Sequence, residues 1–352
     1  MVKKSRNLRL NNATDSNDFQ RRHARNYYLM GTQRAEEGAL DEARMLLERA
    51  LEFDPDFSPA LLTMASLELS NHQFASARKF VERALALDQN DIDALTLLGN
   101  IQLTERNPSA ALDAYHRALK AGCSTPELKF FTGVAHLFLE EAENAAEIFA
   151  NLLEEDPTHQ RAWDALGSAR RMMKDHTGAI NAFMKALELD PNSCDSRDHL
   201  AQVLLDVGNP QRAIQLLESV LAIEPHRDTT RHLLGMANAT LRDYLTAVSC
   251  WSSLIAEGAG SADTFHLLAN AYLQLDDNVR ARETLQSLIA LYPEHVSGHM
   301  QLAMMLIESG EQSMGLQHLE TARRLDPQNP LIGHVLLTAQ GFKMSDSTLG
   351  EK

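Results

Sequence analysis

Residues 186–191 read Ala-Leu-Glu-Leu-Asp-Pro, and close variants of this string stand at 50–55 (Ala-Leu-Glu-Phe-Asp-Pro) and 322–327 (Ala-Arg-Arg-Leu-Asp-Pro). Each gap between the strings is 136 residues, which is four times 34. A register of 34 residues then divides most of the chain without an insertion or deletion. It gives nine blocks, the last of which ends at residue 329. They start at residues 24, 58, 92, 126, 160, 194, 228, 262 and 296. A fixed period of this length is typical of repeat architectures.

Two positions in each block carry only small residues. Position 8 is Gly or Ala in all nine blocks, and position 20 is Ala in eight blocks and Gly in the ninth. Large apolar residues recur around them at helical spacing, such as Tyr115, Phe149 and Trp251 at position 24. Two helices approach closely only where neither carries a bulky side chain at the contact. Each block therefore predicts a pair of helices that cross near positions 8 and 20.

The ends of the blocks carry helix-stop signals. Proline stands at position 32 in six of the blocks, where the second helix must end. Blocks three and seven end differently, in Ala-Gly-Cys-Ser-Thr-Pro (121–126) and Glu-Gly-Ala-Gly-Ser-Ala (257–262). These two ends are either ordinary variation in the turn or softer joints in the array.

The pattern resembles the tetratricopeptide repeat (TPR) family, whose hallmarks are the 34-residue period, small residues at positions 8 and 20, Ala at 27 and Pro at 32. The fifth block is close to the family consensus, in Trp163, Leu166, Gly167, Ala179, Phe183, Ala186 and Pro191. The resemblance covers residues 24–329 and implies an all-α fold, a right-handed α-solenoid of stacked helix-turn-helix repeats. It also implies a capping helix at 330–341. We expect a basic mobile arm at 1–23 and a mobile tail at 342–352.

Composition narrows the class of partner. The net charge of −15 argues against nucleic-acid binding, which needs a basic surface. Residues 1–25 nevertheless carry a local balance of +5, so a basic arm precedes an acidic body. No apolar run approaches the roughly 20 residues of a membrane-spanning helix. No secretory signal is readable, and three widely spaced cysteines indicate free thiols in a reducing compartment, so we expect a cytoplasmic protein.

The chain contains no motif for catalysis, and we expect neither an enzyme nor a cofactor. It has no Gly-rich phosphate loop, no His-Glu-x-x-His and no Gly-x-Ser-x-Gly. His199, His232 and His266 fall at similar positions of consecutive first helices. Such helices lie about 8–10 Å apart, so three imidazoles on them would not reach the ~2 Å bonds of a zinc site. We expect no metal and interpret these histidines as polar lining.

The concave wall formed by the first helices is where the family meets its ligands. In repeats two to four, the positions expected on this wall carry large apolar residues: Leu62, Leu97, Phe130, Phe131, Val134 and Phe138. Exposed apolar patches normally mark contact sites. These residues are therefore the candidate partner-binding groove, although some of the rings could instead pack against neighbouring helices or the arm.

Repeats five to eight have a polar and mainly acidic wall. Its candidate residues are Asp164, Asp195, Asp198, His199, Asp206, His232, His266 and Asn270. An apolar groove that continues into an acidic one suits an extended or helical peptide with an apolar anchor and a basic flank. The carboxylate clamp and the asparagine ladder of specialised family members are both absent, since Phe131 stands where the clamp needs Asn.

The sequence thus favours a non-catalytic scaffold or adaptor that binds segments of other proteins in its groove. Two alternatives stay open. One is a regulatory subunit of a separate enzyme. The other is a self-assembling scaffold, in which the basic arm of one copy docks into the acidic groove of another.

Overall fold

The structure, a computed structural model, describes residues 2–339 as nineteen α-helices without a strand, so about 79% of the chain is helical. The first helices of the nine repeats are α1 (Val2–Glu36), α3 (Ser58–Ser70), α5 (Ile92–Thr104), α7 (Pro126–Phe138), α9 (Gln160–Met172), α11 (Cys194–Asp206), α13 (Asp228–Thr240), α15 (Ala262–Gln274) and α17 (Val296–Glu308). The second helices are α2 (Leu40–Phe53), α4 (Phe74–Leu87), α6 (Pro108–Lys120), α8 (Ala142–Glu155), α10 (His176–Leu189), α12 (Pro210–Leu221), α14 (Tyr244–Ala256), α16 (Asn278–Leu291) and α18 (Gln312–Leu325). A last helix, α19 (Pro330–Ala339), follows them.

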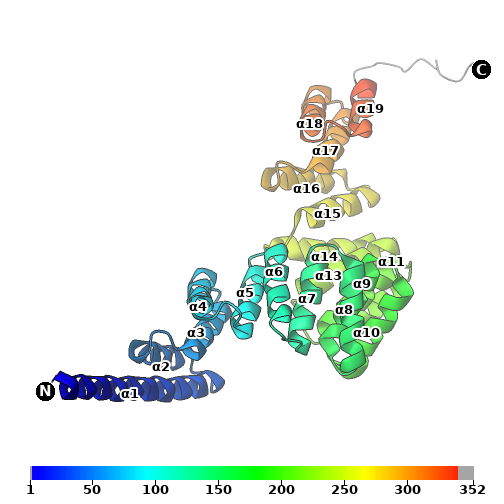
Figure 1. The fold of residues 1–352 in the computed structure, drawn as a ribbon. Coiled ribbons are helices and arrows are strands. Elements are labelled where there is room, and N and C mark those ends of the chain that lie inside the picture. Colours follow the sequence, from blue (N-terminus) through cyan, green and yellow to red (C-terminus); the bar gives the residue numbers. More distant parts are fainter. Residues whose placement is uncertain (1, 340–352) are drawn as a thin grey trace, which may run out of the picture. The chain divides into compact units, whose positions relative to one another are not determined.

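Consecutive helices pack in pairs, as Figure 1 shows within each part of the chain. The first helices of repeats two to nine begin at the block starts of the 34-residue register. This confirms the all-α, repeated helix-pair architecture that the sequence predicts. The helix α19 packs on α18 and lies where the capping helix was expected, while the predicted tail at 342–352 lies outside the described residues.

The N-terminal boundary differs from the prediction. The sequence predicts an arm at 1–23 and a first repeat that starts at residue 24, but α1 runs without a break from Val2 to Glu36. Residues 2–36 contain one Gly, Gly31, and no Pro. Because adding a residue to an existing helix costs far less than nucleating a new one, the first helix of repeat one extends into the arm.

The turn inside each repeat has one recurrent conformation. The residue at position 15 has a positive φ in all nine repeats, and it is Gly only at Gly38, Gly208 and Gly310. The two unusual repeat ends use the same conformation one residue before position 32, at Gly122 (φ 100°) and Gly258 (φ 80°). A left-handed Gly after the last helical turn ends a helix as Pro does elsewhere. Repeats three and seven therefore end through a different stop signal.

The contact between the two helices of a repeat depends on positions 8 and 24. A Cβ added to Gly99 would lie 2.2 Å from the ring of Tyr115, and one added to Gly167 would lie 2.6 Å from Phe183. The small residue at position 8 thus makes room for the large side chain at position 24 of the same repeat. The alanines at position 20 are fully buried in all eight repeats that have them.

The chain forms two compact units, residues 1–189 and 190–352, and the division falls between repeats five and six. Inside each unit, the hydrophobic clusters join the second helix of one repeat to the first helix of the next. In the first unit, for example, Leu47 and Ala50 of α2 pack with Ala60 and Met64 of α3. Helices inside each unit are thus packed between their neighbours, and the first-helix wall presents an accessible surface.

Candidate functional site

An apolar hollow of about 400 Å³ lies on the first-helix wall of repeats two to four. Three residues of the predicted groove, Phe131, Val134 and Phe138 on α7, line it. The remaining lining residues are Leu69 on α3 and Asn100, Leu103 and Thr104 on α5. None of these seven side chains is charged, so the hollow suits an apolar group.

The packing of consecutive first helices creates the hollow. Helix α3 contacts α5, and α5 contacts α7, so residues 34 positions apart lie side by side. Phe131 and Val134 are half-buried against the core below, whereas the Phe138 side chain is 57% exposed. Phe138 follows Val134 by one helical turn, and its ring therefore forms the rim of the hollow.

One polar side chain in the hollow is fixed in orientation. The Tyr115 hydroxyl donates to Asn100 Oδ1 at 2.8 Å. This bond holds the amide so that its NH₂ group is left as a donor at the wall of the hollow. Burial raises the pKa of Tyr115, which keeps the phenol neutral and able to donate. The hollow thus combines apolar walls with one oriented amide donor.

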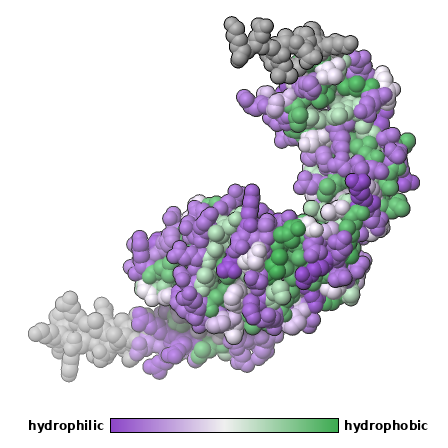
Figure 2. Space-filling view, turned by 90° about the vertical axis from the view of Figure 1, so that its right-hand side faces the viewer, coloured by the Kyte–Doolittle hydropathy of each residue, from purple (hydrophilic) through white to green (hydrophobic). Residues whose placement is uncertain are grey.

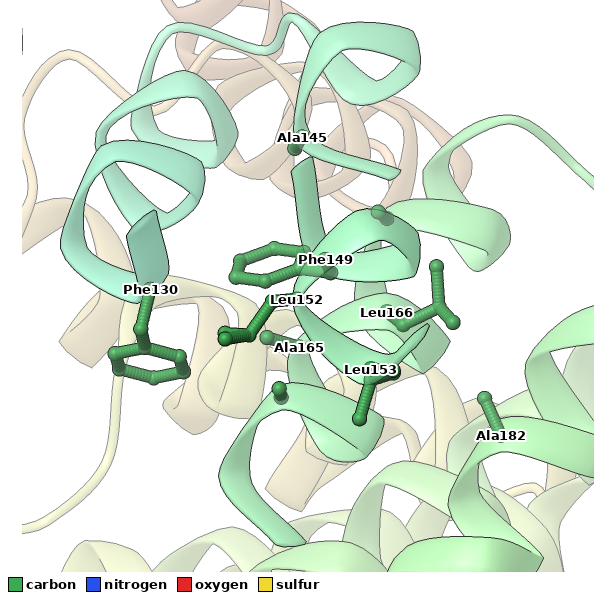
Figure 3. Close-up of a cluster of buried hydrophobic side chains, with 10 residues drawn as sticks. Phe130, Ala145, Phe149, Leu152, Leu153, Ala165, Leu166 and Ala182 are labelled. Atoms are coloured by element: carbon green, nitrogen blue, oxygen red, sulfur yellow. The ribbon is translucent and has the colours of Figure 1, made fainter. Parts of the chain in front are cut away.

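Phe130 does not belong to the groove that the sequence predicted. Its ring is buried, 5.8 Å from the Phe149 ring and 5.3 Å from the His159 ring, and the Arg161 guanidinium covers it at 4.5 Å. Figure 3 shows Phe130 within the cluster that also contains Phe149 and Leu152. The reason is geometric, because position 5 of a first helix faces the start of the next repeat, while position 6 faces the open wall.

Leu62 and Leu97 contribute to the wall only indirectly. Both are half-buried and pack against the core cluster of repeats two and three, and neither lines the hollow. Their place is taken by Leu69 and Leu103, which sit at position 12. Position 12 was not among the positions expected on the first-helix wall. Its apolar character in two consecutive repeats was the signal that could have revealed it.

Two residues of the predicted acidic wall, Asp195 and Asp198, pair with Arg227 in the second unit. Asp198 on α11 is only 2% exposed and accepts hydrogen bonds from Arg227 Nε at 2.7 Å and from Thr230 Oγ1 at 2.8 Å. Arg227 also pairs with Asp195 and with Glu224. The bond to Asp198 is the main cause of a raised pKa of Arg227, so its guanidinium stays charged. Asp198 therefore joins α11 to the start of α13 and is not an open groove residue. Asp195 pairs with Arg227 but stays exposed.

The remaining polar candidates make local contacts. His232 Nδ1 lies 3.3 Å from Thr264 Oγ1. The His266 ring lies tilted against that of His295 with ring centroids 5.5 Å apart, and Asn270 accepts from Gln301. Burial lowers the pKa of His232 and His266, which favours their neutral forms. Asp164 and His199 are half-buried and Asp206 is exposed, and each of the three has an interaction partner. The structure does not bring this set together at one place.

Family comparisons agree with the register of the repeats. Residues 149–261 match the TPR domain described for cytochrome c-type biogenesis protein H, and residues 34–101 and 263–295 match two general tetratricopeptide repeat descriptions. These matches fall in both units. The chain is a tetratricopeptide repeat protein. None of the three matching descriptions names an enzyme.

Solved structures support the same fold for this TPR protein. The Cut9–Hcn1 hetero-tetramer of the APC/C superposes with a TM-score of 0.58 at 18% identity, over 85% of this chain and 59% of that one. The chain thus spans less than two thirds of that relative. PilF of Pseudomonas aeruginosa superposes with a TM-score of 0.53 at 15% identity, over 60% of this chain and 96% of that one. No curated protein sequence matches the TPR protein significantly.

The part of the TPR protein that the structure describes shows neither a membrane-spanning helix nor a metal-binding cluster. None of its helices has the length and apolar character needed to cross a bilayer. No three His, Cys, Asp or Glu side chains converge there in a way that could hold a metal ion. In the face that Figure 2 shows, hydrophobic residues form groups between hydrophilic ones.

Proposed function

We propose that this TPR protein is a non-catalytic scaffold that holds a segment of a partner protein on the first-helix wall of repeats two to four. The hollow lined by Leu69, Leu103, Phe131, Val134 and Phe138 is its anchor point. The observation that carries the proposal is this uncharged hollow of about 400 Å³ beside a Phe138 side chain that is 57% exposed. An aromatic residue left in water next to an open apolar hollow is typical of a contact site.

The hollow also defines the chemistry of the segment. Its apolar walls favour a large aliphatic or aromatic side chain, because a charged one would lose its hydration without gaining a partner. The Asn100 amide can donate to a backbone carbonyl on either side of that anchor. The segment is therefore one that presents a single apolar anchor with an accessible main-chain carbonyl. A basic flank, which the sequence suggested, has less support at Asp198, because that carboxylate is buried and paired with Arg227.

The proposal is tested by replacing Phe138 with a photo-crosslinking aromatic amino acid and irradiating the protein in its native cell. The matched control places the same amino acid at Leu245 on α14, which is apolar and 72% exposed but lies outside the hollow. We expect discrete crosslinked proteins from position 138 that are absent from position 245. They should also be lost when Val134→Asp is added, because the carboxylate would occupy the hollow.

Equal crosslinking from both positions, or crosslinking that survives Val134→Asp, would contradict the assignment of the hollow. Circular dichroism of each variant verifies that the helices remain folded. For any partner identified in this way, the expected loss of affinity with Phe138→Asp is at least about tenfold, which is the scale of an interface hot spot.

A further inference from the structure

Two imidazoles meet inside repeat nine. His299 on α17 is only 7% exposed, and its Nδ1 atom lies 3.0 Å from Nδ1 of His318 on α18. The ring centroids are 5.3 Å apart. His318 is half-buried and is the partner that reaches toward solvent. The two side chains therefore form a direct hydrogen bond between the two helices of the last repeat.

The neighbouring carbonyl decides which nitrogen carries a proton. Nε2 of His299 lies 3.0 Å from the carbonyl oxygen of Pro293, and a carbonyl can only accept. Trp163 makes the same bond in repeat five, where its Nε1–H donates to the Pro157 carbonyl at 2.9 Å. Nε2 of His299 therefore carries the proton and its Nδ1 is bare when the ring is neutral. The hydrogen bond is then donated by Nδ1–H of His318.

This arrangement limits how many protons the pair can hold. With one added proton, a single N–H still lies between the two Nδ1 atoms, and the hydrogen bond survives. With two added protons, both Nδ1 atoms carry hydrogen and two positive rings face each other at 3.0 Å in a largely buried place. That state has no hydrogen bond and adds charge repulsion. The fully protonated pair is therefore incompatible with the closed contact between α17 and α18.

No carboxylate compensates the charge. Neither imidazole forms an ion pair with any residue that the structure describes. The other titratable or charged groups on the packed helices are Glu308 on α17, Glu320, Arg323 and Arg324 on α18, Arg280, Arg282 and Glu283 on α16, and His334 on α19. Burial, followed by the charge of His299, lowers the pKa of His318.

A second pair stands at the entrance to the same repeat. His295 Nδ1 accepts the N–H of Gly298 at 2.9 Å and so caps the start of α17. Its ring lies 5.5 Å from that of His266 on α15, whose buried Nδ1 has no hydrogen-bond partner. Protonation of His295 at Nδ1 would remove the cap. A positive charge on His266, in the preceding repeat, would repel the protonated His295 ring. Asp263 on α15 acts in the opposite sense by favouring the charged form of His266.

We propose that the His299–His318 contact is a pH-sensitive switch that keeps repeat nine closed at neutral pH and opens it on acidification. Repeat nine can open alone because a solenoid repeat contacts only its neighbours and this one ends the array. Opening α18 and α19 away from α17 would expose the cluster of Ala303, Leu319, Ala322, Ile332 and Leu336. Acid would thus expose an apolar surface that is buried at neutral pH.

Proton linkage gives the direction in which the stability of closed repeat nine changes with pH. An imidazole in the opened repeat has its ordinary pKa of about 6.5. In the closed repeat, burial lowers the pKa of His318, and the facing Nδ1 atoms exclude a second added proton. Below that pH the open form binds more protons than the closed form, so the closed form loses stability as the pH falls. Between pH 7.5 and 5.5, each histidine that stays neutral in the closed repeat favours opening by about tenfold.

Hydrogen exchange of the full-length protein at pH 7.5 and pH 5.5, corrected for the intrinsic exchange rate, tests the proposal. We expect protection in residues 296–339 to fall at least about tenfold more than in repeats two to four. His318→Asn is the decisive variant, because its amide replaces the Nδ1–H donor and does not titrate. It should keep its protection at pH 7.5 and lose most of the pH dependence, whereas His334→Asn on α19, at an exposed position, should behave as the wild type.

A uniform loss of protection over all repeats would overturn the proposal, as would an unchanged pH dependence in His318→Asn. If that variant fails to fold, NMR titration of the wild-type imidazoles decides the question. We expect at least one ring of the pair to stay neutral well below pH 6.5. Two rings that both titrate like free histidine would refute the switch.

Discussion

The side chain at position 24 determines which residue position 8 can hold. A Cβ on Gly235 would lie 2.5 Å from Nε1 of Trp251, and one on Gly133 would lie 2.6 Å from the Phe149 ring. Repeats with Ala at position 8 have no aromatic residue at position 24. They pair Ala65 with Val81, Ala201 with Leu217, Ala269 with Leu285 and Ala303 with Leu319. The two positions are therefore coupled within each repeat.

This coupling predicts the effect of Gly235→Ala. The added methyl group overlaps the indole of Trp251, and overpacking of this kind lowers the free energy of unfolding by about 1 to 3 kcal/mol. Adding Trp251→Leu should recover part of the loss, because Ala with Leu is a natural combination in three other repeats. Urea unfolding of the two single variants and the double variant measures the coupling. Strictly additive losses would show that the two sites are independent.

The residue at position 15 offers a stabilising change. Arg242 has φ 63°, a conformation that costs a residue with a Cβ about 1 kcal/mol. Arg242→Gly should therefore raise the free energy of unfolding by about 0.5 to 1 kcal/mol. The reverse change in the same repeat, Gly258→Ala at φ 80°, should lower it by a similar amount. Thermal unfolding of both variants checks the prediction, and a loss of stability in Arg242→Gly would contradict it.

At the scale of the helices, arginines at the start of α13 connect it to α11 and to the end of α14. Arg227 connects α13 to Asp198 on α11, and Arg231 makes two bonds of 2.7 Å to Glu257 at the end of α14. Because Asp198 is almost fully buried, its carboxylate depends on Arg227 and Thr230 for hydrogen bonds.

Arg227→Ala should therefore destabilise the second unit by about 2 to 3 kcal/mol, since it leaves a buried carboxylate with Thr230 as its remaining side-chain partner. The control is Arg280→Ala, which removes an exposed pair with Asp277 and should change stability by no more than about 0.5 kcal/mol. Urea unfolding followed by Trp251 fluorescence reports on the unit that contains both sites. Equal effects of the two changes would exclude the structural role of the network.

At the scale of the whole molecule, the two compact units each contain one tryptophan, Trp163 in the first and Trp251 in the second. Burial lowers the pKa of three histidines in the second unit, His232, His266 and His318. Their neutral forms are favoured in the folded state, so the unfolded state takes up protons first as the pH falls below about 6.5. Stability of the second unit should therefore decrease from pH 7.5 to pH 5.5.

The two tryptophans allow the stability of each unit to be measured separately. Trp163→Phe leaves Trp251 as the reporter of the second unit. Trp251→Phe leaves Trp163 as the reporter of the first, and Phe at position 24 already accompanies Gly at position 8 in repeats four and five. The urea midpoint of the second unit should fall more on acidification than that of the first. A larger fall in the first unit would be inconsistent with control by these three histidines.

Much of this architecture follows from the sequence alone. The 34-residue period, the small residues at positions 8 and 20 and the Pro at position 32 are local signals, because each constrains a helix or a turn within one repeat. They were sufficient to predict the helix pairs, the starts of the first helices from Ser58 onward and the helix at Pro330. The extension of α1 to Val2 was missed because the arm carries no apolar periodicity, while helix propagation needs none.

The site depended on contacts between repeats, which a single-repeat pattern does not contain. Phe130 and Phe131 are adjacent in the sequence and were predicted alike, yet one ring is buried against His159 and the other lines the hollow. Asp198 was predicted to face the groove, but Arg227, 29 residues later, buries its charge. The period and the composition determine the helices and turns within each repeat. Only the stacking of one repeat on the next decides which side chains remain open to a partner, because that stacking places residues about 30 positions apart in contact.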